Sequence, residues 1–328
     1  MPLKTTLELS ITIDAKKFYK LLHKANPIGE YDSYDDDSNY VDQSISHKGV
    51  LIKYKNKTYN KKVTLIIDTD KIIGGAEFVP DILISRLEKR IAKYFNAKYQ
   101  LNDFTLTGMT ISADVNLQNK DMVDAYMKLM SRLGRVKGYS KSNSNPFSDD
   151  VSFCLEGNSN FIEFVVLDLE GALKEQLEGT GYKKKQIDLM QKDTTGILRV
   201  EVRLMKSKAI RDYTDDAIPT VQIVELLRKN QDIFCEIFFS ILPFGDSYKQ
   251  NKTIELIREK VDDVRLRRKM IRLVELVPEK KSLLLAQKAL DCRNLDEVME
   301  MFADIEVSPV TISKRSDEKM LDNLIKFI

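Results

Sequence analysis

The stretch Ile197-Leu198-Arg199-Val200-Glu201-Val202-Arg203-Leu204 predicts a β-strand of a half-buried sheet. Apolar and charged residues alternate strictly along it, so the apolar side chains share one face of the strand. Arg199, Glu201 and Arg203 therefore share the other face. Three charges in line could bind a phosphate or a metal-bound phosphate. The alternative is a solvated sheet face with ion pairs between strands.

The elements predicted from the N-terminus up to and including this strand occur twice in a similar order. The first set comprises a strand at 8–13, a helix at 14–24, a hairpin of strands 49–55 and 62–68, a helix at 80–95 and a strand at 104–115. The second set comprises a helix at 120–133, a hairpin of strands 151–156 and 161–168, a helix at 170–190 and a strand at 196–205. We therefore predict an α/β (α+β) fold, with duplicated helix–hairpin–helix–strand units that form a largely antiparallel sheet.

Beyond Pro219 the pattern becomes wholly helical, which predicts an appended helical region. The polar stretch 139–149 predicts a linker. We expect three segments: a first α/β unit at 1–138, a second at 139–218 that shares one sheet with the first, and a helical C-terminal region at 219–328.

Composition excludes several classes of protein. The chain has 328 residues, with 52 Lys and Arg against 50 Asp and Glu. The net charge of +2 therefore does not indicate that the partner is a polyanion or a membrane. If the protein binds a polyanion or a membrane, it must do so through a local patch of charge. No apolar run approaches the roughly 18 residues of a spanning helix, and the N-terminus lacks the apolar core of a signal peptide. We expect a cytoplasmic protein without a membrane partner. The three cysteines form no CxxC pair, which argues against a disulfide framework or a zinc site.

Carboxylates near the 197–204 strand are candidate metal ligands. Asp114 lies near the end of the predicted strand 104–115, Glu163 lies in a hairpin strand, and Glu201 lies in the alternating strand itself. Oxygen ligands on adjacent strands suit Mg²⁺ or Mn²⁺. The only histidines are His23 and His47, so no histidine cluster competes with this prediction.

Basic segments and tyrosines offer further candidates for DNA contact. The candidate phosphate-binding residues are Arg199, Arg203, Lys206, Lys208, Arg135, Lys137, Lys183 and Lys184. Tyr182 and Tyr213 lie beside cations, and either could stack on bases or attack phosphorus. Each basic segment also fits an ordinary amphipathic helix. The chain contains no P-loop, no GxGxxG after a strand and no GxSxG motif.

A family resemblance rests on residues 100–215. The strand 104–115, the following helix, the Gly157-Asn158-Ser159-Asn160 turn into 161–170 and the 197–204 strand resemble rolling-circle replication initiators of the Rep-trans class and related conjugative relaxases. The resemblance implies a duplicated α/β region, a helical accessory region, and DNA nicking and joining by a tyrosine assisted by Mg²⁺ or Mn²⁺.

Two departures from the family pattern concern the chemistry. The family's nucleophilic tyrosine corresponds to Leu167, which cannot attack phosphorus. The family's Thr-Arg-x-Asp strand corresponds to Thr107-Gly108-Met109-Thr110, so only Asp114 and Glu201 are left as metal ligands.

These observations lead to one main hypothesis and two alternatives. The main hypothesis is a replication-initiator-like protein of a plasmid, phage or integrated element that binds single-stranded or hairpin DNA without nicking it. The first alternative is an active nicking-closing enzyme with Tyr182 or Tyr213 as nucleophile and Asp114 and Glu201 holding the metal. The second is a protein-interaction module on a degenerate nuclease scaffold.

Overall fold

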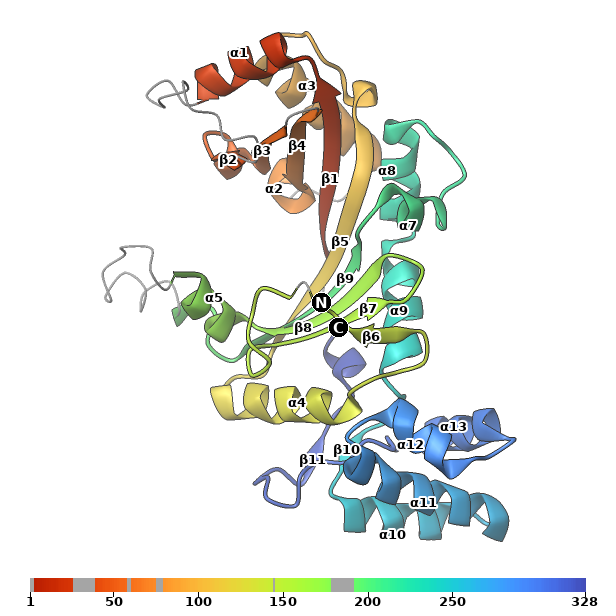
Figure 1. Cartoon of the computed structure of the whole chain (residues 1–328). Coiled ribbons are helices and arrows are strands. Elements are labelled where there is room, and N and C mark those ends of the chain that lie inside the picture. Colours follow the sequence, from red (N-terminus) through yellow and green to blue (C-terminus); the bar gives the residue numbers. More distant parts are fainter. Residues whose placement is uncertain (1–2, 26–38, 58–59, 75–78, 144, 178–191) are drawn as a thin grey trace. The chain divides into compact units, whose positions relative to one another are not determined.

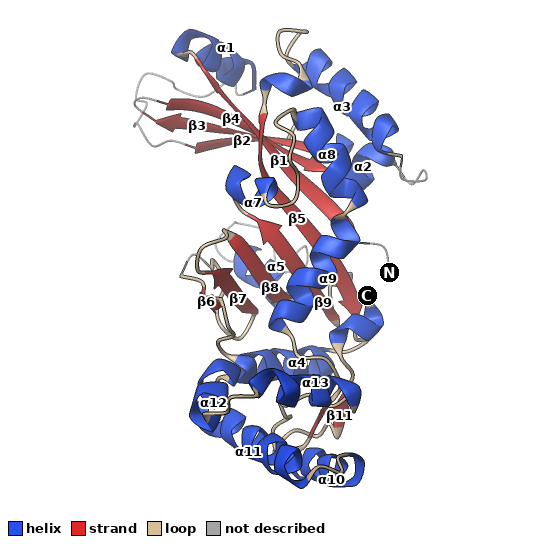
Figure 2. Ribbon diagram, turned by 90° about the vertical axis from the view of Figure 1, so that its right-hand side faces the viewer, coloured by secondary structure: helices blue, strands red, loops and turns tan. Residues whose placement is uncertain are grey.

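The computed structural model describes residues 3–25, 39–57, 60–74, 79–143, 145–177 and 192–328 (Figure 1). The predicted mixed fold with a large, largely antiparallel sheet is confirmed (Figure 2). The strands of the sheet are β1 (Lys4–Ile13), β2 (Asn39–Asp42), β3 (Val50–Lys57), β4 (Asn60–Asp68), β5 (Thr105–Asn116), β6 (Tyr139–Lys141), β7 (Ser152–Gly157), β8 (Ile162–Asp168) and β9 (Ile197–Leu204). They are hydrogen-bonded in the order β2-β3-β4-β1-β5-β9-β8-β7-β6.

The helices occupy most of the predicted segments. They are α1 (Ala15–Ala25), α2 (Thr69–Ile73), α3 (Pro80–Tyr94), α4 (Lys120–Leu133), α5 (Leu169–Leu177), α7 (Ser207–Arg211), α8 (Pro219–Arg228), α9 (Asn230–Ile241), α10 (Gln250–Lys260), α11 (Val264–Lys280), α12 (Leu283–Leu290) and α13 (Leu295–Asp304). The predicted helix 170–190 is described only as far as Leu177. Its remainder, and the acidic loop at 32–37, lie outside the described residues.

Contacts between residues divide the chain into two compact units. The N-terminal unit contains residues 3–111 and 203–233, and the C-terminal unit contains residues 112–202 and 234–328. These two units have other boundaries than the three segments predicted from the sequence. That each of the three segments folds as a unit stays a prediction.

The N-terminal unit packs its helices on one face of its strands. Alternating residues of β1, β3 and β4 are buried, among them Leu9, Ile52 and Leu65, while the intervening residues are largely half-buried or exposed. Phe18 of α1 and Leu87 of α3 are fully buried. The helix α1 begins after Asp14, whose Oδ1 accepts a hydrogen bond from the backbone N–H of Lys17 (2.9 Å). A single amphipathic face per helix thus provides the core.

The C-terminal unit buries both faces of β8. On one face Phe164 meets Phe238 of α9, with ring centroids 6.1 Å apart. On the other face Val165 and Leu167 join a cluster with Cys154 and Ala172. Leu167 is therefore part of the core of this unit.

The helix α4 connects the sheet of this unit to its C-terminal helices. Its predicted bounds and its cap are both correct: Asn119 Oδ1 accepts from the N–H of Met122 (2.9 Å). The side chain of Arg132 donates to the carbonyl of Thr311 (2.7 Å). The same helix also carries Tyr126, whose hydroxyl donates to the carbonyl of Asp322 (2.8 Å).

Two sequence predictions about secondary structure are wrong in part. Residues 139–149 are not simply a linker, because Tyr139–Lys141 forms the edge strand β6, paired antiparallel with β7. A strand of three residues is too short to produce a pattern of alternation. The region beyond Pro219 is not wholly helical, because β10 (Ser247–Tyr248) pairs with β11 (Met320–Leu321).

No helix in the described ranges is long and apolar enough to cross a membrane.

Candidate nucleic-acid interface

Arg199, the first candidate phosphate-binding residue from the sequence, forms an ion pair inside the C-terminal unit. Its Nε and Nη2 donate to the two carboxylate oxygens of Asp114 at 2.5 and 2.9 Å, and Nη1 lies 4.0 Å from Glu201. The hydrogen bonds that Arg199 donates to Asp114 raise the pKa of Arg199. Because its guanidinium already donates to both carboxylate oxygens of Asp114, Arg199 is not open to an incoming phosphate. The cross-strand ion pair of the alternative prediction is present, but it is not solvated, because Glu201 is buried and Arg199 is half-buried.

The metal prediction involves the same carboxylates. Within the described residues, no three His, Cys, Asp or Glu side chains are grouped so that they could hold a metal ion. Asp114 already accepts two hydrogen bonds from Arg199. Glu163, buried in β8, and Glu201 also have interaction partners. A role for Mg²⁺ or Mn²⁺ stays a prediction.

The other predicted residues are spread over both units. Arg203, Lys206, Lys208 and Tyr213 belong to the N-terminal unit, where each has an interaction partner. Arg135 and Lys137 are exposed in the C-terminal unit. Tyr182, Lys183 and Lys184 lie outside the described residues. The described candidates are therefore divided between the two compact units.

A different basic surface is formed by the helices of the N-terminal unit. Lys17, Lys20 and Lys24 recur at a spacing of three or four residues, so they lie along one side of α1. The helix α3 presents Arg90 and Lys93 in its last turns. Like charges at this spacing destabilise a helix by a few tenths of a kcal/mol per pair. Their accumulation here therefore costs stability that a bound anion would restore.

Two cavities of about 260 and 270 Å³ lie between these helices and the neighbouring loops. They share Lys24 and Tyr94, and together we call them the basic cleft. Its charged lining residues are all cations: Lys17, Lys20, Lys24 and Lys98 around the first cavity, and Lys24, Lys48, Arg90 and Lys93 around the second. No carboxylate is among the described residues that line either cavity. Lys17 pairs with Asp14 outside the lining (3.0 Å), and the remaining cations give the cleft a local excess of positive charge although the whole chain is nearly neutral.

Tyr94 is held rigidly between the two cavities. Its hydroxyl donates to Asp42 Oδ2 (2.5 Å) and lies 2.7 Å from the hydroxyl of Tyr54. Lys24 donates to the carbonyl of Tyr94 (3.0 Å), and its Nζ lies 5.4 Å from the centre of the ring. A fixed aromatic ring with a cation beside it is a suitable platform for a nucleic-acid base.

Tyr99 supplies a second ring to the cleft. Phe95 meets it edge to face, with centroids 5.5 Å apart. Arg90, at the other cavity, donates to the carbonyl of Ile72 (3.4 Å), and burial together with the nearby Arg86 lowers the pKa of Arg90. No described carboxylate neutralises Arg90, so a bound phosphate would relieve this repulsion.

We expect the buried Tyr54 and the half-buried Tyr94 to cause a loss of stability at alkaline pH. Burial raises the pKa of both Tyr54 and Tyr94 above the ordinary value of about 10. Above that pH the unfolded chain loses phenolic protons that the folded chain retains, so stability falls as pH rises. We expect the urea midpoint to fall between about pH 9 and 11. A Tyr94→Phe variant should show a shallower fall. An identical pH slope in the variant would contradict this assignment.

The exposed face of β3 and β4 carries a second row of cations. Lys53, Lys55 and Lys57 alternate with buried residues along β3, and Lys62 of β4 is paired directly opposite Lys55. The three lysines of β3 are exposed and Lys62 is half-buried. None of these four lysines lines either cavity of the basic cleft, so the row provides a charge-matched comparison for it.

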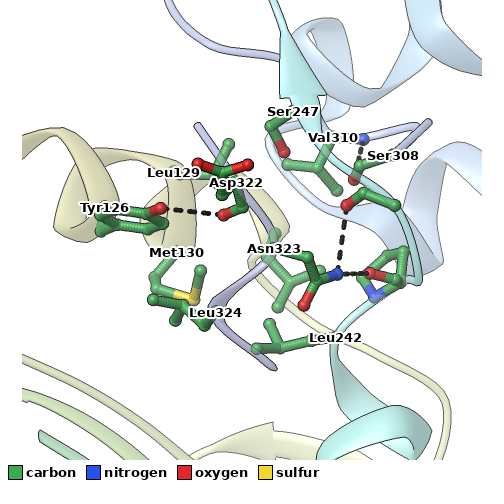
Figure 3. Close-up of a pocket in the computed structure, with 13 residues that line it drawn as sticks. Tyr126, Leu129, Met130, Leu242, Ser247, Ser308, Val310, Asp322, Asn323 and Leu324 are labelled. Atoms are coloured by element: carbon green, nitrogen blue, oxygen red, sulfur yellow. Dashed lines mark hydrogen bonds between the residues drawn. The ribbon is translucent and has the colours of Figure 1, made fainter. Parts of the chain in front are cut away.

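A further cavity in the C-terminal unit is structural (Figure 3). Its volume of about 30 Å³ has room for only one or two waters. Around it the side-chain amide of Asn323 donates to the carbonyls of Pro243 and Gly245 at 2.9 and 3.1 Å. These bonds attach the C-terminal segment to the loop that follows α9.

The residues of the basic cleft were missed in the sequence, although a signal was present. Basic residues at helical spacing in 16–24 and 86–93 could have been recognised from the sequence. The sequence could not show that these residues lie beside Lys48, Lys98 and the tyrosines, because they come from separate loops and helices. No family model matches the chain, and no curated protein or solved structure matches it significantly.

Proposed function

We propose that the protein binds single-stranded or hairpin DNA through the basic cleft of its N-terminal unit. The observation that carries this proposal is a pair of adjoining cavities lined by seven cations and two tyrosine rings, with no carboxylate among their described lining residues. Cations that follow a phosphate backbone and rings that stack on bases are the two elements of single-strand binding.

The geometry favours an open strand over a regular duplex. The two cavities are separate recesses that share only Lys24 and Tyr94. Flexible, unpaired nucleotides could enter each recess and stack, whereas stacked base pairs present mainly phosphates. Contacts of this kind depend little on base sequence.

We place this binding activity in a replication-initiator-like protein of a plasmid, phage or integrated element, acting in the cytoplasm without nicking DNA. The resemblance of residues 100–215 supports the initiator class. The packing of Leu167 in the core, where the family has its tyrosine, supports the absence of cleavage.

The first experiment is fluorescence anisotropy with labelled single-stranded, hairpin and duplex DNA of about 20 nucleotides. We expect the single strand and the hairpin to bind more tightly than the duplex. With about five phosphate contacts, affinity should fall about 100-fold between roughly 50 and 200 mM salt. Absence of binding at the lower salt, or affinity insensitive to salt, would overturn the proposal.

A further inference from the structure

A larger cavity of about 470 Å³ lies in the C-terminal unit, between the end of α4, the strand β7 and the start of α12. This volume falls within the range of small-molecule sites, roughly 300 to 1,000 Å³. The residues lining it are Ser131, Gly134, Arg135, Lys141, Asp149, Ser152, Phe153, Cys154, Leu155, Lys281, Ser282 and Leu285. None of them lines the basic cleft.

The end of α4 is joined firmly to the start of α12 beside this cavity. Ser282 Oγ donates to the carbonyl of Arg135 (3.2 Å), and the N–H of Leu284 donates to the same carbonyl (3.0 Å). Gly134 has φ of +60°, and a β-carbon there would clash with the carbonyl oxygen of Lys281. The backbones that carry Arg135 and Lys281 are therefore held at defined neighbouring positions.

The lining combines an excess of positive charge with an apolar wall. Of its three cations, Lys141 pairs with the only lining carboxylate, Asp149. Arg135 and Lys281 have no carboxylate partner in the described ranges. Phe153 is half-buried, and Leu285 is 43% exposed although it is a large apolar residue. Two open cations beside an apolar wall fit a ligand with an anionic end and an aromatic body.

One polar group of the lining has no hydrogen-bond partner among the described residues. Ser152 is only 2% exposed, and its hydroxyl oxygen makes no hydrogen bond to any described residue. Buried hydroxyls are rarely left in this state without a reason. Because side chains alternate along β7, this hydroxyl lies on the face of Cys154 and not on that of Phe153.

We propose that this cavity binds a nucleoside phosphate, with the phosphates at Arg135 and Lys281 and the base against Phe153 and Leu285. The volume exceeds what a lone phosphate needs, and the apolar wall gives a base a surface to pack on. The ligand could be a free nucleoside phosphate or the phosphorylated end of a DNA strand, because both present the same chemistry. The inference does not depend on DNA binding in the basic cleft.

The test is a titration of the full-length protein with a fluorescent N-methylanthraniloyl derivative of ATP. We expect saturable binding that unlabelled ATP displaces. An Arg135→Gln/Lys281→Gln variant should bind about tenfold to 100-fold more weakly, because it loses two charge-assisted hydrogen bonds. Leu285→Glu, a change at an exposed position, should weaken binding comparably. The matched control is Lys128→Gln/Lys288→Gln, which removes two exposed lysines that do not line the cavity.

The competitors identify the source of the ligand. Displacement by ATP but not by a 5′-phosphorylated oligonucleotide indicates a free nucleoside phosphate, and displacement by both indicates a strand end as well. Absence of saturable binding, equal affinity in the cavity and control variants, or equal displacement by inorganic phosphate would overturn the proposal. A variant of the basic cleft that loses DNA binding should still bind the ATP derivative, so the two proposals can fail independently.

Discussion

Replacing Lys20, Lys48, Lys93 and Lys98 together with glutamine should abolish most of the affinity for single-stranded DNA. All four are exposed, they line the basic cleft, and none has a side-chain ion pair with a described residue. Their removal should therefore leave the fold intact. Each lost phosphate contact lowers the salt slope on a single strand by about 0.7. Four lost contacts lower affinity at about 0.1 M salt by two to three orders of magnitude.

The matched control removes four lysines from the exposed face of β3 and β4, away from the basic cleft. Lys53, Lys55, Lys57 and Lys62, changed together to glutamine, alter net charge by the same amount. We expect less than about a fivefold change in affinity, because screening weakens charges that do not touch the DNA. Anisotropy against salt concentration measures both variants.

The two variants together locate the interface. If the sheet-face variant loses affinity and the cleft variant does not, the cleft assignment is wrong and the interface lies on the lysine row. If both variants bind like the parent protein, neither surface of the N-terminal unit is the interface. Circular dichroism of each variant checks that it is folded.

Lys120→Met should produce the largest loss of stability of any single surface substitution that we consider. Lys120 donates to Asp168, whose side chain is only 1% exposed. The other oxygen of Asp168 has no hydrogen-bond partner among the described residues. Without Lys120 a buried carboxylate is left with no cation, which costs about 3 kcal/mol. Urea denaturation followed by circular dichroism measures this loss.

A double variant separates the charge from the packing. In Lys120→Met/Asp168→Asn the buried group is neutral, so we expect at least half of the lost stability to return. Lys120 also pairs with the half-exposed Asp124 (2.8 Å), and Asp124→Asn should cost less than about 1 kcal/mol. A single Lys120→Met variant within about 0.5 kcal/mol of the parent protein would show that the Lys120–Asp168 ion pair does not stabilise the fold as we expect.

The regular elements of the fold could be predicted from the sequence because their signals are local. Apolar alternation placed 196–205 close to the observed Ile197–Leu204, and the cap at Asn119 and the glycine at 134 bounded α4 correctly. The short strands β6, β10 and β11 carry no such signal. They exist because backbone groups of distant segments pair with them.

For the candidate sites, too, local patterns could be predicted from the sequence, whereas contacts between distant segments could not. The alternation of Arg199, Glu201 and Arg203 correctly predicted a charged strand face, but only the tertiary structure shows that Asp114 neutralises Arg199. Nothing in the sequence distinguishes a paired arginine from an open one, because pairing depends on which residue a neighbouring strand presents.

The sequence by itself determined the mixed fold, its order of helices and strands and the basic periodicity of α1, since each follows from the chemistry of nearby residues. Tertiary structure decided which cations remain open to a ligand. Lys24, Lys48 and Lys98 reach the basic cleft from three separate segments, and Arg135 and Lys281 meet only where α4 ends and α12 begins. Binding sites depend on such long-range packing, which local residue patterns do not encode.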